Sequence, residues 1–321
     1  MSDRPYRRAG EWMELDRDGL SALAGFREAF PEEQLNAHQV RQWLLTHTNL
    51  SAKWINRLFS VGGIQAEGDI VQLLAFPALG KNGSRAAASY GAAAAPSSSA
   101  AVPVLFEDDF CLVLLKPAGM PVHESRPGQT GTLDEAASAH MRLSGDPLTV
   151  RHIHRLDEDT SGPVLYAKND LAQWVLDEAM RAKRIGRQYI ALVHGRLQRS
   201  SGVIDAPIGK DRHHPARRRA GSGDPAVTRY ETIESFGDST LVRLTLETGR
   251  THQIRVHMSY LGHPLIGDRL YGGDDRILPY QALHGESLRF DHPWSGEPID
   301  VAAPDPDWLQ PLVDKLRRRR N

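Results

Sequence analysis

Apolar residues recur at helical spacing in two stretches near the start of the chain. The first stretch spans residues 40–47 and the second spans residues 54–59. Ser51 is placed to cap the second helix, and Gly62-Gly63 is placed to end it. A short apolar run that follows predicts a strand. We therefore predict a small N-terminal α/β module over residues 1–79.

The segment 80–101 is dominated by alanine, serine and glycine. Such a segment cannot bury enough apolar area to offset the entropy that is lost on ordering. It predicts a flexible linker. It is the clearest domain boundary in the chain.

Apolar strands and amphipathic helices alternate without a regular repeat after the linker. Strands are predicted at residues 102–106, 110–115, 163–167, 188–193, 227–234 and 240–246. Helices are predicted to begin at Thr132, which forms a capping box with Glu135, at Leu171 and at Thr251. This order is typical of an α+β domain in which flanking helices cover a mixed, mainly antiparallel β-sheet. We assign residues 102–304 to this domain and residues 305–321 to a basic C-terminal tail.

The composition is that of an ordinary globular protein, since 40% of the 321 residues are hydrophobic and 25% are charged. The single cysteine, Cys111, excludes a disulfide framework and suits a reducing compartment. No apolar stretch approaches the ~20 residues of a transmembrane helix, and the first residues lack the features of a secretory signal. We expect a soluble cytoplasmic protein with no membrane partner.

Charge is unevenly distributed along the chain, although the net charge is −1. Between Arg181 and Arg219, eleven Lys and Arg residues stand against two acids, which gives this segment +9 and leaves −10 for the rest. A concentrated basic surface is typical of a protein that binds nucleic-acid phosphates. A solvated basic loop without a partner has the same local composition.

The densest group of ionisable residues lies in the segment 151–162, directly before an apolar strand. A loop held by a strand in this way is where a scaffold presents reactive groups. Asp157 has arginine close by, which favours an ionised carboxylate, and a desolvated carboxylate is a competent nucleophile. Taken alone, the segment is also typical of a surface loop with local Arg–Asp pairs.

Two further segments carry candidate chemistry. Tyr189 lies on an alternating strand, where it is either a core aromatic or a ring that stacks on a nucleobase. The segment 248–258 begins a helix among polar residues. Its N-terminal amides, together with Arg250 and Arg255, favour an anion such as a phosphate or a carboxylate.

The chain resembles the RluA-type pseudouridine synthases in four motifs, which it carries in the same order: residues 116–120, 154–162, 187–195 and 249–257. The resemblance continues through residues 262–268 and covers approximately residues 102–304. The departures from the family pattern are small. Pro163 stands where an aliphatic residue is usual, and Gly285 replaces an alanine.

The N-terminal module resembles, in shortened form, the small RNA-binding module of ribosomal protein S-four type. Arg41, Lys53 and Arg57 lie off the apolar stripes of its two predicted helices. They would form either a basic face that binds RNA or ordinary solvated charges.

The resemblance implies that the protein isomerises specific uridines in a structured ribosomal or transfer RNA to pseudouridine. Asp157 would be the nucleophile, attacking either C1′ of the ribose or C6 of the ring, and the base would turn over and rejoin the sugar through C5. Tyr189 would stack on the uracil and assist removal of the C5 proton, and Arg255 would pair with Asp157. Arg155 would fill the gap left by the flipped nucleotide. The candidate substrate-binding residues are His154, Arg155, Thr160, Lys210, Arg212, Arg250, His252 and Gln253.

The implied reaction involves no redox change and no group transfer, so we expect neither a cofactor nor a metal, and we expect a monomer. Two alternatives stay open at this point. One is a catalytically silent RNA-binding protein on the same scaffold. The other is a retaining glycosidase that uses Asp157 together with Glu158 or Asp159.

Overall fold

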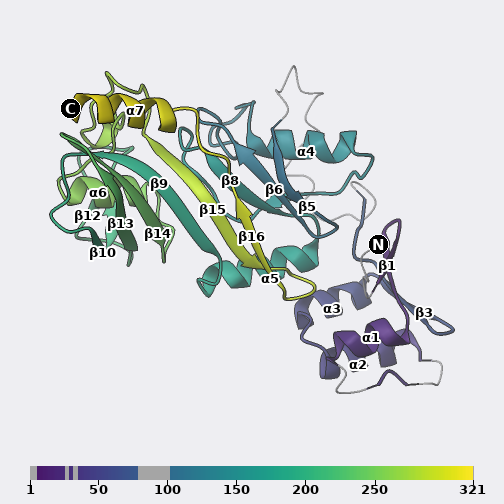
Figure 1. Cartoon of the computed structure of the whole chain (residues 1–321). Coiled ribbons are helices and arrows are strands. Elements are labelled where there is room, and N and C mark those ends of the chain that lie inside the picture. The colour runs from purple at the N-terminus through teal and green to yellow at the C-terminus, as the bar shows by residue number, and fades with distance from the viewer. Residues whose placement is uncertain (1–5, 26–28, 32–34, 79–101, 321) are drawn as a thin grey trace.

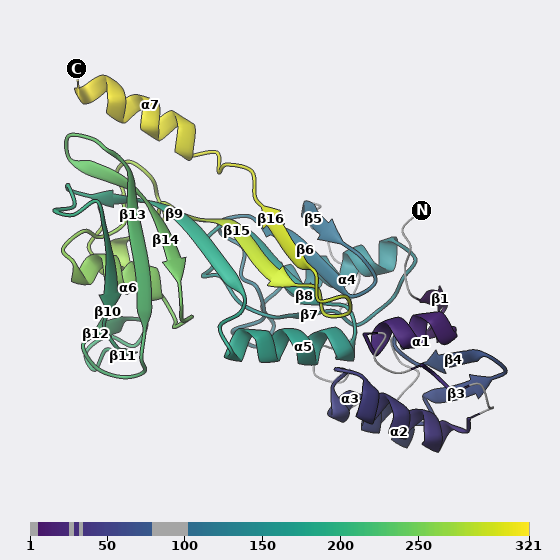
Figure 2. The same ribbon diagram turned by 60° about the horizontal axis from the view of Figure 1, so that its bottom comes forward.

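The structure is a computed structural model that describes residues 6–25, 29–31, 35–78 and 102–320. The linker predicted at residues 80–101 lies outside the described residues. The N-terminal module lies at one end of the molecule, and the C-terminal helix α7 (Leu309–Arg320) lies at the other end (Figure 1, Figure 2).

The N-terminal module, within residues 6–78 as described, combines a four-stranded antiparallel sheet of order β1–β2–β4–β3 with helices. Its elements are β1 (Arg7–Ala9), β2 (Trp12–Leu15), α1 (Arg17–Leu23), α2 (Ala37–His47), α3 (Ala52–Ser60), β3 (Ile64–Glu67) and β4 (Ile70–Leu73). The two helices predicted from apolar spacing are confirmed as α2 and α3, and Gly62 follows α3 with a φ of 68°. Ser51 stands at the N-cap of α3, but its side chain makes no capping bond. Strands β1 and β2 and helix α1 were not predicted, because at three, four and seven residues they are too short to show a clear apolar period.

The larger domain contains every predicted strand and helix in the predicted order, together with further strands and a C-terminal helix that were not predicted. Its elements up to the basic segment are β5 (Val104–Glu107), β6 (Cys111–Lys116), α4 (Leu133–Leu143), β7 (Arg151–His152), β8 (Gly162–Ala167), α5 (Asp170–Arg181) and β9 (Gly186–His194). The remaining elements before α7 are β10 (Ser201–Asp205), β11 (Ile208–Lys210), β12 (Arg218–Ala220), β13 (Val227–Ser235), β14 (Ser239–Leu246), α6 (Gln253–Tyr260), the 3-10 turn η1 (Arg269–Tyr271), β15 (Leu283–Asp291) and β16 (Pro298–Ala302).

Two antiparallel sheets form the frame of the larger domain, in the orders β5–β6–β8–β7 and β10–β13–β14–β9–β15–β16. Figure 1 shows the long strands β9 and β15 running side by side through its middle. The sheets meet where β8 begins, because the amide of Gly285 on β15 donates to the carbonyl of Ser161 at 2.8 Å. The predicted α+β class with a mainly antiparallel sheet is confirmed.

The larger sheet is covered on both faces. Successive side chains of β9 point to opposite faces. Ala191 packs in the cluster that contains Ile254 of α6, whereas Leu192 packs with Val313 and Leu316 of α7. The segment predicted as a basic C-terminal tail therefore includes a helix with a buried apolar face.

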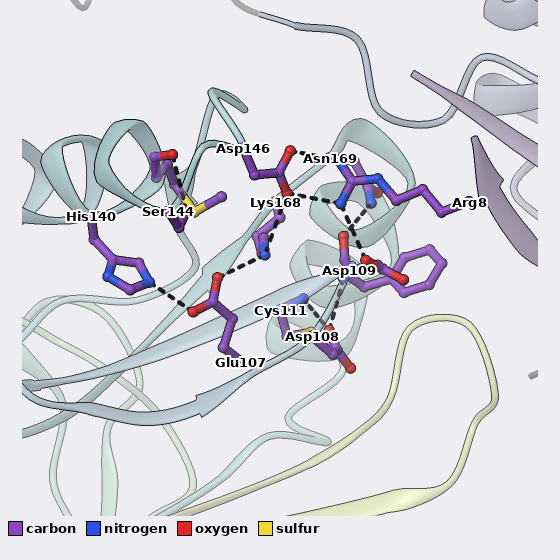
Figure 3. A network of polar contacts seen from close by, with 12 residues as sticks. Arg8, Glu107, Asp108, Asp109, Cys111, His140, Ser144, Asp146, Lys168 and Asn169 are labelled. Atoms are coloured by element: carbon purple, nitrogen blue, oxygen red, sulfur yellow. Dashed lines mark hydrogen bonds and ion pairs between the residues drawn. The ribbon is translucent and has the colours of Figure 1, made fainter. Parts of the chain in front are cut away.

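Arg8 of β1 docks the N-terminal module onto the larger domain. Its guanidinium donates to Asp109 at 3.2 Å and to Asp146 at 2.8 Å (Figure 3). Lys168, which is 5% exposed, joins the same group of charges by donating to Glu107 at 2.8 Å (Figure 3). One apolar cluster also runs from the module into the smaller sheet of the larger domain. The two parts are therefore in contact through both polar and apolar groups.

A second polar contact between the two parts involves Arg57 of α3, whose guanidinium pairs with Asp170 of α5 at 2.7 Å. Arg41 donates to Asn56 at 2.8 Å and lies over the ring of Phe59. The guanidinium of Arg57, whose side chain is 42% exposed, is therefore paired with a carboxylate of the larger domain.

None of the described helices combines the length and the apolar character that a membrane crossing requires.

Candidate active site

A cleft of about 770 Å³ lies between the β7–β8 loop, strand β9 and the start of helix α6. Its lining includes all three predicted catalytic residues, Asp157, Tyr189 and Arg255. Of the predicted substrate-binding residues, six also line it: His154, Arg155, Thr160, Arg250, His252 and Gln253. The fold thus brings together side chains that lie up to 101 positions apart in the chain, between His154 and Arg255.

The β7–β8 loop holds the backbone around Asp157 from two sides. The amide of Thr160 donates to the carbonyl of Asp157 at 3.0 Å, and the ammonium of Lys116 donates to the carbonyl of Glu158 at 2.6 Å. The Asp157 side chain itself is 24% exposed. The loop therefore fixes the backbone while its carboxylate faces the cleft.

Lys116 is fully buried at the end of β6. Besides Glu158, it donates to the carbonyls of Pro117 at 2.9 Å and Met120 at 2.6 Å. Burial lowers the pKa of Lys116 to about 7, against the opposing charges of nearby carboxylates that include Asp157. All three hydrogen-bonding directions of this ammonium group therefore go to backbone carbonyls.

Arg255 on α6 connects two carboxylates. Its Nε and Nη2 donate to Asp268 at 2.7 and 2.9 Å, and its Nη1 donates to Oδ2 of Asp157 at 3.0 Å. Asp268 is 1% exposed. Burial alone would lower the pKa of Arg255, but its hydrogen bonds to Asp268 and the charge of Asp157 raise it above its ordinary value. The guanidinium is therefore a fixed cation beside Asp157.

Tyr189 lies on β9 and is 5% exposed. Burial raises the pKa of its hydroxyl above the ordinary value; the charge of Asp157 adds to this effect and that of Arg187 opposes it. The facing strand β15 has a register shift between Gly285, which pairs with Tyr189, and Ser287. Such bulges are frequent next to active sites, where they re-aim a side chain.

The start of α6 differs from the prediction by one residue. The N-cap is His252, with a left-handed φ of 59°, and not Thr251. The imidazole Nδ1 of His252 accepts from the hydroxyl of Tyr271 at 2.8 Å. This tertiary contact holds the backbone conformation that turns the chain into the helix.

Gln253 is 3% exposed, and its amide group is fully used within the protein. Its oxygen accepts from Thr248 at 2.7 Å and from the amide of Arg250 at 3.0 Å, while its nitrogen donates to the carbonyl of Val227 and to Thr228, both at 2.9 Å. Gln253 therefore braces the turn before α6, and its contact with substrate stays a prediction.

The basic hairpin, which we define as β11, β12 and the loop between them, lies beside α6. The amide of Arg218 donates to the Tyr271 hydroxyl at 2.9 Å, and the same hydroxyl contacts His252. Lys210 and Arg212 belong to this hairpin but do not line the cleft. They lie next to the site and not within it.

The three remaining predicted substrate-binding residues of the β7–β8 loop differ in how far their side chains are exposed. His154 is 6% exposed, and its Nε2 accepts from the amide of Leu165 at 3.3 Å. Thr160 is buried, and its hydroxyl accepts from Gln281 at 3.3 Å. Arg155 is exposed and makes no hydrogen bond or ion pair with the described part of the chain.

Sequence reasoning missed the roles of Lys116, Asp268 and Arg187. All three lie inside the segments that carry the family resemblance, so their positions were visible. Their roles were not visible. The roles of Lys116 and Asp268 depend on contacts with a different part of the chain, and that of Arg187 depends on a lack of such contacts with the described residues. No group of three or more His, Cys, Asp or Glu side chains that would suit a metal occurs among the described residues.

Comparisons with known proteins identify the family of the chain. A family model described as RNA pseudouridylate synthase matches residues 110–260. The uncharacterised RNA pseudouridine synthase YhcT of Bacillus subtilis (strain 168) is 47% identical over 206 residues, which are 63% of this chain and 68% of the relative. Ribosomal large subunit pseudouridine synthase D of Vibrio vulnificus (strain CMCP6) is 40% identical over 233 residues, 67% of this chain and 70% of the relative.

Among solved structures, Human RNA Pseudouridylate Synthase Domain Containing 1 aligns with a TM-score of 0.55 and 28% identity, covering 70% of this chain and 98% of that one. The matches define the class as RNA pseudouridine synthases, which are isomerases. Within that class, the chain belongs to the RluA-type family, whose members isomerise uridine in RNA.

Proposed function

We propose that Asp157 is the nucleophile with which this enzyme converts specific uridines of a structured ribosomal or transfer RNA to pseudouridine. The observation that carries the proposal is the clamp on Arg255. Because two of its nitrogens bind Asp268, the plane of the guanidinium is fixed, and the third contact holds Oδ2 of Asp157 at 3.0 Å. The other carboxylate oxygen, Oδ1, has no hydrogen-bond partner in the described part of the chain, which leaves it available for attack.

The isomerisation breaks the bond between C1′ and N1 and forms a bond between C1′ and C5. Asp157 attacks either C1′ of the ribose or C6 of the uracil, and a covalent intermediate divides the reaction into two easier steps. After the base has turned over, C5 bonds to C1′, C5 loses its proton and N1 gains one. The atoms of the nucleoside are conserved, so the reaction calls for no redox cofactor.

Tyr189 provides the surface against which the uracil stacks. Because burial raises the pKa of its hydroxyl, Tyr189 enters the reaction as a neutral phenol at neutral pH. A neutral aromatic ring is suited to stacking, and its hydroxyl is suited to orienting the base while the C5 proton is removed.

Substrate binding uses charge outside the cleft. Flipping a nucleotide out of the RNA costs stacking energy. The exposed side chain of Arg155 fills the gap that the flipped nucleotide leaves. Lys210 and Arg212 of the basic hairpin contact phosphates, and such contacts make binding weaker as salt rises. Relatives named for the large ribosomal subunit make its RNA the first substrate to test.

We further infer that residues 102–304 carry the activity and that the protein acts as a cytoplasmic monomer. The support for the compartment is Cys111, whose buried thiol suits reducing conditions. Gel filtration coupled to light scattering measures the oligomeric state directly.

The test uses ribosomal RNA from cells that lack this gene, labelled with tritium at C5 of uridine. Isomerisation releases tritium without free uracil, whereas release of free uracil indicates a glycosidase. No change in the RNA, despite binding, indicates a catalytically silent RNA-binding protein. Pseudouridine mapping of total RNA with and without the gene then identifies the uridine.

Asp157→Asn should abolish tritium release and keep RNA affinity within a few-fold, because phosphate contacts lie elsewhere. Glu178→Gln is the matched control, since Glu178 is an exposed acid on α5 that does not line the cleft. Full activity of Asp157→Asn in a preparation free of other synthases would remove Asp157 as the nucleophile.

A further inference from the structure

Arg187 is a buried arginine without an anion beside it. It lies on β9, lines the cleft and is 8% exposed. Its guanidinium forms no hydrogen bond or ion pair with any described residue, and its Nε is buried without a partner. Burying a charge without a partner is costly. An oxygen of a ligand that enters the cleft would therefore pair with this guanidinium.

The guanidinium of Arg187 lies on the wall that the uracil is proposed to contact. Arg187 and Tyr189 are two residues apart on one strand, so their side chains share a face of the sheet. A Cβ added to Gly249 would lie 2.6 Å from Nη1 of Arg187. The guanidinium therefore crosses the backbone of Gly249, which lines the same cleft.

His154 offers a second unused donor nearby. Because its Nε2 accepts from the amide of Leu165, the proton of the neutral ring is on Nδ1. Both His154 and Arg187 line the cleft, and burial, with a contribution from the charge of Arg187, lowers the pKa of His154 to about 3. The backbone of Arg155 acts as a weak hydrogen-bond partner of this imidazole and opposes the shift, but the buried Nδ1 forms no bond of full hydrogen-bond geometry with a described residue.

We propose that Arg187, together with Nδ1–H of His154, binds a carbonyl oxygen of the target uracil and stabilises the negative charge that the base gains during the reaction. This inference rests on the proposed function. When Asp157 bonds to C1′, the electron pair of the C1′–N1 bond passes to the uracil and is shared by N1, O2 and O4. Attack at C6 instead places the charge on O4. In both routes the base is neutral again once C5 has joined C1′ and N1 has gained a proton to balance the one that C5 loses.

The observations favour the base over a backbone phosphate as the ligand. Arg187 and His154 are more deeply buried than Asp157, whose side chain is 24% exposed. They lie beside Tyr189, against which the base stacks, and the backbone of a bound strand stays nearer the surface. A neutral imidazole N–H also suits a carbonyl oxygen that gains charge in the transition state.

The first experiment compares Arg187→Gln and Arg187→Lys with the wild type on the ribosomal RNA described above. The single-turnover rate at saturating enzyme should fall by about 10²–10³-fold for Arg187→Gln, the range typical for loss of one charge-stabilising donor. RNA affinity should stay within a few-fold. Arg142→Gln is the matched control, because Arg142 on α4 is exposed and lies outside both the cleft and the basic segment 181–219. An unchanged rate, or a defect confined to RNA affinity, would overturn the proposal.

The second experiment separates a chemical role from a structural one. Fluorine at C5 stabilises a negative charge on uracil, so RNA containing 5-fluorouridine should depend less on Arg187. Nuclease digestion and mass spectrometry measure how fast the target 5-fluorouridine is consumed. We expect Arg187→Gln to slow this consumption by a factor at least about tenfold smaller than the factor by which it slows the reaction of uridine. Equal defects on both substrates would indicate a structural role and reject the inference.

Gly249→Ala provides an independent variant, because its Cβ would displace the Arg187 guanidinium. It should reproduce the same substrate dependence. Different results would reject this inference and the proposed function. Activity in Asp157→Asn removes the nucleophile, whereas wild-type rates in Arg187→Gln with an inactive Asp157→Asn reject only the role of Arg187.

Discussion

Pro163 and Gly285 face each other where the two sheets of the larger domain meet. A Cβ added to Gly285 would lie 3.0 Å from Cδ of Pro163, which is tighter than an ordinary contact. These are the two positions at which the chain departs from the RluA-type pattern. The departures therefore compensate for each other, because the glycine makes room for the proline ring beside the loop that carries Asp157.

Gly285→Ala should lower the free energy of unfolding by about 1–3 kcal/mol, the range typical of overpacking a core. The pyrrolidine ring of Pro163 is stiff and cannot move aside. In a Pro163→Val background the same change should cost less, since the clashing Cδ is gone. Urea unfolding of the wild type, the two single variants and the double variant gives the coupling energy between the two positions.

Gly237→Ala is the matched control, because no atom lies within 4 Å of an added Cβ there. Equal costs for Gly285→Ala in both backgrounds would show that the two departures are independent.

Much of the fold could be predicted because its signals are local. The capping box of Thr132 and Glu135 marks the start of α4, and the apolar spacing marks α2 and α3. Strand β1 lacks such a signal, because it has three residues and two of them are arginine. Helix α7 does have apolar residues at helical spacing, Leu309, Val313 and Leu316, but the run of arginines that follows them favours the interpretation as a basic tail.

The candidate site could be predicted only in part. Asp157, Tyr189 and Arg255 were found because they lie in dense polar motifs between apolar strands. The second contact of Arg255, to Asp268, and the use of the Gln253 amide inside the protein depend on the tertiary fold. The sequence of a motif does not show whether a polar side chain in it contacts the substrate or another part of the protein.

Arg8→Ala should loosen the docking of the N-terminal module. The change removes two carboxylate contacts, to Asp109 and Asp146, from a side chain that is 21% exposed. We expect faster cleavage by a protease between the two parts, together with a loss of about 1–3 kcal/mol in unfolding free energy.

Arg7→Ala is the control for that experiment. Arg7 is the neighbouring residue, but its side chain is 76% exposed and pairs with Glu14 at the surface. Exposed pairs of this kind contribute about 0–1 kcal/mol. Equal protease sensitivity in the two variants would show that Arg8 does not hold the module.

Lys116 should make stability depend on pH. Its pKa is about 7 in the folded protein, against an ordinary value of 10.5. Between these values the unfolded chain binds more protons, so the stability of the wild type should rise with pH from 7 to 10 relative to Lys116→Met. The slope of the difference is at most about 1.4 kcal/mol per pH unit. Urea unfolding at several pH values measures it, and a flat difference would show that the ammonium keeps its ordinary pKa.

Asp268→Asn should slow the reaction without removing any group that touches the RNA. The amide can still accept one hydrogen bond from Arg255 but loses the charge and the two-point contact of the carboxylate. Arg255 is then free to turn, so Asp157 loses its fixed orientation, and the single-turnover rate should fall by about 10-fold or more, in line with a positioning defect. RNA affinity should stay within a few-fold. Asp275→Asn is the control, because it removes an acid that pairs with the exposed Arg269. A rate for Asp268→Asn equal to that of the control would mean that Asp157 keeps its orientation without the buried half of the clamp.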